Sequence, residues 1–127
     1  MQYPANLMYT ASHEWVEFTG DSTAKIGLTD YAQDALGDVV FVNLPETGDG
    51  LTAGESFGDV ESIKAVSDLI SPFSGIVSAV NGAPAASPEK INEAPYESWL
   101  IEISNISTRV ELLDAAGYEK LCADTGA

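Results

Sequence analysis

The sequence predicts a mainly β, single-domain protein in which short antiparallel strands form a sandwich or a small barrel, with a few short helices, including at the C-terminus. Three observations predict this class. The chain has 127 residues, of which 45% are hydrophobic and 20% charged, a size and composition typical of one globular domain. Several β-type runs with turn signals between them lie in residues 39–80. Helical patterns are short and lie outside that region. We therefore treat residues 1–127 as one domain.

The first predicted elements are a hairpin and a short helix. Residues 13–19 (HEWVEFT) and 24–28 (AKIGL) are β-type runs, and the turn-forming sequence Gly20-Asp21-Ser22 separates them. The apolar spacing then changes and predicts a helix over residues 30–36. Gly37 can end this helix in a left-handed conformation.

The central part of the chain alternates between apolar runs and turn sequences. Residues 45–50 and Ser71-Pro72 carry the strongest turn signals. Short strands at this spacing favour an antiparallel arrangement. We expect strands at residues 39–44, 56–63, 65–70 and 75–80.

The C-terminal part is predicted to contain a loop, a strand and two short helices. Residues 81–95 are rich in Pro and Ala and lack strand alternation, which indicates an ordered surface loop. Residues 99–103 (WLIEI) are a strand candidate. Thr108 and Glu111 have capping-box spacing, which predicts a helix that Gly117 ends. We expect a second short helix to hold Tyr118, Leu121 and Cys122.

The charge of the chain limits its partners. Twenty acidic and five basic residues give a net charge of −15, so nucleic acids and anionic membranes are repelled, whereas basic protein surfaces are attracted. The sequence shows neither a secretory signal nor the roughly 18 apolar residues of a membrane span. We expect a monomer in the bacterial cytoplasm or, after removal of a presequence, in the mitochondrial matrix.

Conventional catalytic and metal sites are disfavoured. Cys122 is the only cysteine and His13 the only histidine, so thiolate clusters and histidine-rich metal sites cannot form. The chain has no phosphate-binding loop with a Walker pattern and no GxSxG nucleophile motif. We expect no metal and no enzymatic activity, and we assign His13 a structural role through a hydrogen bond near the first strand.

Lys64 is the residue that calls for a functional explanation. It lies between Ile63 and Ala65 in the predicted bend joining two strands, where a long side chain would be held out in water. Three roles are compatible with this position: a solvated turn lysine, a Schiff-base nucleophile, or an attachment point for a cofactor. Nucleophilic chemistry needs an uncharged amine, whereas three nearby carboxylates favour the ammonium. Of the other two roles, the solvated lysine is the default, since most lysines are exposed.

The sequence around Lys64 resembles the lipoyl-attachment hairpin of the glycine cleavage system H protein family. The resemblance begins with GDVESIKAVSD at residues 58–68, followed by Ser71-Pro72 and Ser74-Gly75. Further matches in the family's order are HEWV (13–16), GLTDYAQDALGDVVFVNLP (27–45), Asn92, Pro95-Tyr96 and Trp99. Biotin carriers usually flank their lysine with methionines, and the shorter lipoyl domains of 2-oxo acid dehydrogenases lack the HEWV opening. The resemblance implies a lipoyl-domain-like barrel-sandwich hybrid.

The resemblance also implies the function. Lys64 would carry lipoic acid as N6-lipoyllysine, and this swinging arm would take the aminomethyl group of glycine from the P-protein (glycine decarboxylase) to the T-protein (aminomethyltransferase). Electrons would then pass to the L-protein (dihydrolipoyl dehydrogenase). The protein would be a non-catalytic carrier in glycine decarboxylation.

The same resemblance implies roles for five other residues. Ser12, Glu14, Tyr31 and Asp68 would form a cleft that shelters the aminomethyl-loaded arm, with a carboxylate pairing with its ammonium. Glu61 would be recognised by the lipoate-attaching enzymes. Two other classes of function remain open. The protein could be a lipoyl donor or relay for other lipoate-dependent complexes, or a regulatory scaffold. It could also be an enzyme with Lys64 as nucleophile.

Overall fold

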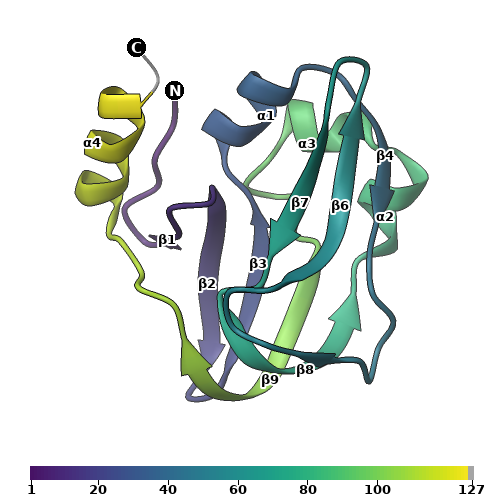
Figure 1. Cartoon of the computed structure of the whole chain (residues 1–127), viewed down its shortest axis with the longest axis vertical. Helices are drawn as coiled ribbons and strands as arrows, with labels where there is room; N and C mark the ends of the chain where they lie inside the picture. Colours follow the sequence, from purple (N-terminus) through teal and green to yellow (C-terminus); the bar gives the residue numbers. More distant parts are fainter. Residues whose placement is uncertain (126–127) are drawn as a thin grey trace.

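The computed structural model describes residues 1–125 and contains two antiparallel sheets (Figure 1). The six-stranded sheet has the order β1-β2-β3-β9-β8-β5, and the three-stranded sheet has the order β4-β6-β7. This architecture confirms the mainly β class. The strands of the larger sheet are, in that order, Met8–Tyr9, Glu14–Gly20, Thr23–Leu28, Ile101–Arg109, Phe73–Val80 and Gly50–Leu51. Those of the smaller sheet are Val39–Asn43, Ser56–Ser62 and Val66–Ile70.

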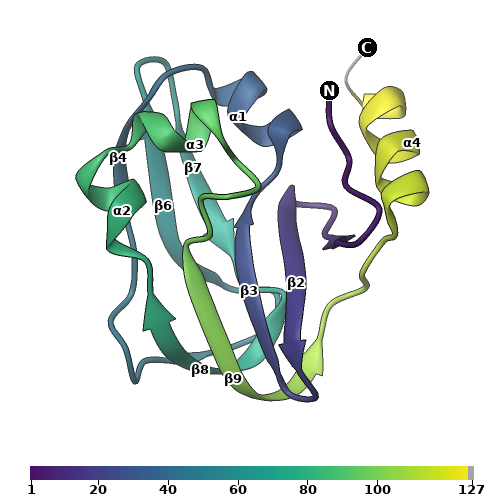
Figure 2. The ribbon, with the colours of Figure 1, turned by 180° about the vertical axis from the view of Figure 1, so that it is seen from behind.

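Within residues 1–125, four helices lie around the sheets. Figure 2 shows α2 and α3 together on one side of the molecule, whereas α4 lies at the other end beside β1 and the N-terminus. The helix α1 stands close to the turn between β6 and β7 (Figure 1). Their bounds are Asp30–Leu36 for α1, Gly82–Ala86 for α2, Glu89–Glu93 for α3 and Ala115–Thr125 for α4.

The apolar core has three parts. Val60 and Leu69 of the smaller sheet pack with Leu28, Leu36 and Leu100. A second cluster, within the larger sheet, holds Val16, Ala24, Ile26, Phe73, Val77, Ile101 and Ile103. A third cluster under α4 contains Leu7, Tyr9, Trp15, Tyr118 and Cys122. Burying each large apolar side chain contributes about 1.5–3 kcal/mol, so the core fixes the positions of both sheets and of α4.

The N-terminal predictions are confirmed. The hairpin β2–β3 has the expected strands, and α1 has the expected bounds. The N–H of Ala32 donates to the Thr29 hydroxyl at 3.1 Å, so Thr29 caps the helix. Gly37 ends it with a φ of 78°, a conformation in which glycine has no side-chain penalty.

The prediction of a loop over residues 81–95 was wrong, because this segment contains α2 and α3. The side chain of Asn81 accepts the N–H of Ala83 at 3.2 Å and caps α2. Pro84 lies in the first turn of α2, where a missing N–H costs little. Pro and Ala in this segment are therefore compatible with short helices.

The prediction of a helix from Thr108 to Gly117 was also wrong. The strand β9 continues to Arg109, and the Thr108 hydroxyl donates to Ser74 Oγ across the β8–β9 pair at 2.7 Å. Cross-strand pairing thus takes the side chain that the capping box would have used. The C-terminal helix begins later, where the N–H of Gly117 donates to the Asp114 carboxylate at 2.8 Å. One helix, α4, holds Tyr118, Leu121 and Cys122.

Asn92 of α3 ties together the segment between α1 and β4. Its Oδ1 accepts the N–H of Val39 at 2.9 Å, and its Nδ2 donates to the carbonyl of Gly37 at 2.8 Å and to Gln33 Oε1 at 3.0 Å. One side chain therefore serves three partners at the end of α1.

Replacing Asn92 with Ala should lower the free energy of unfolding by about 1–3 kcal/mol, because the Val39 N–H and the Gly37 carbonyl lose their partner. Urea denaturation measures this change. The matched control is Asn6→Ala at an exposed site, which should stay within about 0.5 kcal/mol of the wild type. Equal stabilities of the two variants would contradict the bracing role of Asn92.

Candidate functional site

The turn between β6 and β7 is closed by hydrogen bonds at each of its four residues. The N–H of Ser62 donates to the Ala65 carbonyl at 2.8 Å, and the N–H of Ile63 donates to the Asp38 carbonyl at 3.1 Å. The Ser62 hydroxyl accepts the N–H of Lys64 at 3.3 Å and that of Ala65 at 3.1 Å. The backbone of this turn is thus held without any contribution from the lysine side chain.

The side chain of Lys64 is exposed at the tip of this turn, which forms the top of the molecule in Figure 1. Within residues 1–125, no hydrogen bond or ion pair engages its ammonium. Its stem passes over Gly37, since a Cβ added there would lie 3.4 Å from Lys64 Cε. The position lacks the apolar pocket that a Schiff-base lysine needs, so a solvated lysine and an attachment point remain.

A groove begins beside Lys64 and runs between α1 and β7; we call it the α1–β7 groove. Its volume is about 300 Å³. Ala65, Val66 and Ser67 form one side. The other side is formed by the α1 residues Tyr31, Ala32, Ala35 and Leu36, and the inner end contains Ser12, His13 and Leu28. The groove is therefore mostly apolar near the lysine and polar at its inner end.

A second hollow, of about 380 Å³, adjoins the inner end and contains Glu14. Ser12 lines both the groove and this hollow. The hydroxyls of Ser12 and Thr10 donate to Glu14 Oε1 at 2.5 and 2.7 Å, and the N–H of Ile70 donates to Oε2 at 3.3 Å. A buried carboxyl group thus lies in a hollow that shares Ser12 with the α1–β7 groove.

Glu14 is only 1% exposed. Burial raises the pKa of its carboxyl to about 7, although its hydrogen bonds with Ser12, Thr10 and Ile70 act in the opposite direction. The carboxyl can therefore gain or lose a proton near neutral pH, and a cation entering the hollow would favour the carboxylate form.

Three of the four predicted cleft residues come together, and one does not. Ser12, Glu14 and Tyr31 line the groove or the adjoining hollow. Asp68 is exposed and, in the register of the smaller sheet, lies opposite Asp59 on the outer face. Because side chains alternate along a strand, Ser67 faces the groove and Asp68 points away from it. The sequence signal that could have found Ser67 was this alternation.

Glu61 lies on the same outer face as Asp68. In the register of the smaller sheet, Glu61 is opposite both Phe41 and Val66. Phe41 is 62% exposed and Val66 65% exposed. The face next to Lys64 therefore combines carboxylates with exposed apolar side chains.

Two hydrogen bonds to Glu14 could not be predicted from the sequence. The Thr10 hydroxyl and the Ile70 N–H both donate to Glu14, and Ile70 lies 56 residues away along the chain. Only the folded arrangement of β2 against β7 reveals this pairing. His13 has the expected structural hydrogen bond, between its Nδ1 and the Tyr118 hydroxyl at 2.7 Å.

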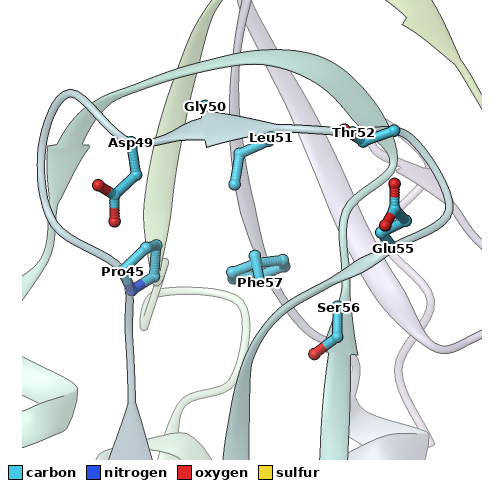
Figure 3. A pocket seen from close by; sticks show the side chains of 8 residues that line it. All are labelled: Pro45, Asp49, Gly50, Leu51, Thr52, Glu55, Ser56 and Phe57. Atoms are coloured by element: carbon cyan, nitrogen blue, oxygen red, sulfur yellow. The ribbon is translucent and has the colours of Figure 1, made fainter.

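A third hollow, of about 370 Å³, lies far from Lys64 at the opposite end of the smaller sheet. Figure 3 shows Asp49 and Glu55 on opposite sides of it, with Leu51 and Phe57 between them. Neither Lys64 nor Glu14 lines this hollow.

No helix within residues 1–125 is long and apolar enough to cross a bilayer. No group of three or more potential ligands among these residues could hold a metal ion.

Comparison with known proteins gives one consistent result. The family model described as glycine cleavage H-protein matches residues 7–125. A glycine cleavage system H protein of Lachnoclostridium phytofermentans is 52% identical over 120 residues, covering 94% of this chain and 94% of the relative. One from Mycobacterium sp. (strain KMS) is 55% identical over 123 residues, covering 92% and 94%. The crystal structure of a glycine cleavage system H protein from Mycobacterium marinum superposes with a TM-score of 0.88 at 42% identity, covering 98% of this chain and 99% of the other.

Replacing Glu14 with Gln should remove a pH dependence of stability. The folded state raises this pKa from 4.5 to about 7, so it binds the proton more tightly than the unfolded state does. The resulting stabilisation is complete below pH 4.5 and is lost as the pH rises through about 7, a loss of up to about 3 kcal/mol. Gln keeps the shape without the charge.

Urea denaturation of the wild type and of Glu14→Gln at pH 4.5 and pH 8 measures this effect. A constant offset between the two proteins reflects changed hydrogen bonds and carries no information about the proton. The difference between their unfolding free energies should change by up to about 3 kcal/mol across this range in favour of the Gln variant. Parallel pH profiles would show that the Glu14 pKa is ordinary.

Proposed function

The chain belongs to the glycine cleavage H-protein family, and from this premise we propose that it is a non-catalytic lipoyl carrier with lipoate attached to Lys64. The observation that carries the proposal is the exposed lysine, whose ammonium has no partner within residues 1–125, on a turn whose four backbone N–H groups are all hydrogen-bonded. An enzyme can acylate such an amine without unfolding anything. The rigid base would then define where the arm starts.

The residues near Lys64 fit this cofactor. When attached, the lipoyl group supplies a disulfide that can be reduced and can carry the aminomethyl group of glycine. Ala32, Ala35 and Leu36 offer apolar walls to a hydrocarbon chain that lies in the α1–β7 groove. The groove starts at the lysine, so the arm and its shelter share one end.

The inner end of the groove fits the cationic load. The Glu14 carboxylate can pair with an ammonium, while Ser12 and Thr10 keep the carboxylate oriented by donating to it. Tyr31 closes the groove from the α1 side. Burial excludes water from this pair and strengthens it. Asp68 faces outward instead, where it adds negative charge toward partner proteins.

The proposed partners are the P-protein, the T-protein and the L-protein, which use the arm in turn. A net charge of −15 would speed encounters with basic surfaces around several active sites, and salt would weaken them. A tethered cofactor raises its own local concentration at each site, so the protein itself can bind weakly and release quickly. We propose that it acts as a monomer in the bacterial cytoplasm, consistent with its bacterial relatives.

Replacing Lys64 with Arg should abolish lipoylation while the fold is kept, because Arg preserves the charge but offers no acylable amine. Intact mass of protein made in a lipoate-competent host should show one added lipoyl group on the wild type, mapped to Lys64, and none on the variant. Circular dichroism controls for folding. A lipoyl group on the Lys64→Arg variant would place the attachment elsewhere.

Replacing Glu61 with Ala should slow lipoylation, because Glu61 lies on the outer face next to the lysine, where the attaching enzyme must dock. The matched control is Glu55→Ala, which removes the same charge at the far hollow. Initial rates with a purified lipoate-protein ligase measure the effect, and we expect a several-fold reduction for Glu61→Ala only. Equal rates for both variants would show that Glu61 is not recognised.

A further inference from the structure

The Tyr118 hydroxyl of α4 joins the inner end of the α1–β7 groove to the start of α1. It lies 2.7 Å from His13 Nδ1 and 2.7 Å from the Thr29 hydroxyl. His13 belongs to the inner end of the groove, and Thr29 caps α1, which forms one of its sides. Tyr118 and Thr29 are both fully buried. A single buried hydroxyl thus connects segments that are far apart in the sequence.

The direction of these hydrogen bonds follows from the available protons. Thr29 Oγ1 already accepts the N–H of Ala32, and among residues 1–125 its own proton has only Tyr118 as an acceptor. Thr29 therefore donates to Tyr118, and Tyr118 donates to His13 Nδ1. This order requires a neutral His13 with its proton on Nε2. Burial lowers the pKa of His13, which agrees with the neutral form.

His13 needs such support because its backbone is strained. Its φ is 74°, a left-handed conformation that is uncommon for residues other than glycine. Its imidazole lies against Tyr31, with ring centroids 4.7 Å apart, and both side chains line the groove. A change at His13 would therefore move the inner end of the groove.

We propose that Tyr118 is a positioning residue for the arm: its hydroxyl fixes His13 and the start of α1 relative to each other and so keeps the inner end of the groove formed. The proposal rests on the proposed carrier function for its role, while the positioning itself concerns the unmodified chain. The ring of Tyr118 stacks on Tyr9 at 4.7 Å, so the ring stays anchored when only the hydroxyl is removed.

The test compares Tyr118→Phe with Tyr9→Phe. The control also deletes a buried tyrosine hydroxyl, which donates to the Pro4 carbonyl at 2.6 Å and touches neither His13 nor Thr29. In the unmodified proteins, ¹⁵N NMR of the His13 ring and amide exchange at Thr29 are measured. We expect the signature of a hydrogen-bonded, unprotonated Nδ1 in the wild type and in Tyr9→Phe. In Tyr118→Phe this signature should be lost, with amide exchange at Thr29 about fivefold faster.

The loaded arm supplies a second readout. Each protein is lipoylated, loaded with the aminomethyl group and placed in buffer without partners, and the release of ammonia is followed. Tyr118→Phe should release it about fivefold faster than the wild type and Tyr9→Phe. Equal changes in the two Phe variants, or none in Tyr118→Phe, would overturn the positioning role. Should the wild type fail to accept the arm, the carrier function fails, and the NMR measurements alone decide the positioning role.

A rescue variant covers the case in which Tyr118→Phe does not fold. Asn tolerates a positive φ better than other non-glycine residues, and its Oδ1 can accept from Tyr118 in place of Nδ1. His13→Asn should therefore keep slow amide exchange at Thr29, whereas His13→Leu should lose it. Equal exchange in these two variants would overturn the proposal.

Discussion

The proposed carrier function depends on a turn whose backbone N–H groups are all hydrogen-bonded without using the lysine side chain. Two-residue hairpin loops usually need positive φ angles, yet in residues 1–125 only His13 and Asn105 among non-glycine residues have them. At the β6–β7 turn, the Ser62 hydroxyl instead accepts the N–H groups of Lys64 and Ala65. Hydrogen bonds to the Ser62 hydroxyl therefore fix the turn, and the Lys64 side chain takes no part in them.

Support for this turn comes from both sheets and from α3. The carbonyl of Asp38 binds the turn through Ile63, and Asn92 holds the residues on either side of Asp38. The burial of Val60 and Leu69 then anchors β6 and β7 in the core. The buried carboxyl of Glu14, in contrast, lowers the stability of the fold when it is ionised, because burial removes its water. A buried carboxyl with a raised pKa is common at functional sites.

Sequence reasoning found the parts that are encoded locally. The hairpin β2–β3, the helix α1 and the Lys64 turn follow from alternation, capping and turn residues within a few positions. The capping-box pattern at Thr108 failed because the partner that claims Thr108, Ser74, lies 34 residues away. The Pro and Ala pattern of residues 81–95 misled because short helices packed on a core need little intrinsic propensity.

The site shows the same division between local and distant information. Ser12 and Glu14 are two residues apart and, like Tyr31, were predicted from the family resemblance. The structure places these three at the groove or the adjoining hollow, and Asp68 on the outer face of the smaller sheet. The Tyr118 link to His13 spans 105 residues, so no local pattern could reveal it. Long-range hydrogen bonds are the part of this site that only the fold supplies.

The most direct test of the central claim is ¹⁵N relaxation of the unmodified protein at residues 60–68. A turn that presents Lys64 from a rigid base should give backbone order parameters at 62–65 of about 0.85, as in the flanking strands. Order parameters below about 0.6 at these positions would mean that the turn is mobile. Lys64 would then be a residue on a flexible loop, and the rigid presentation of the arm would be refuted.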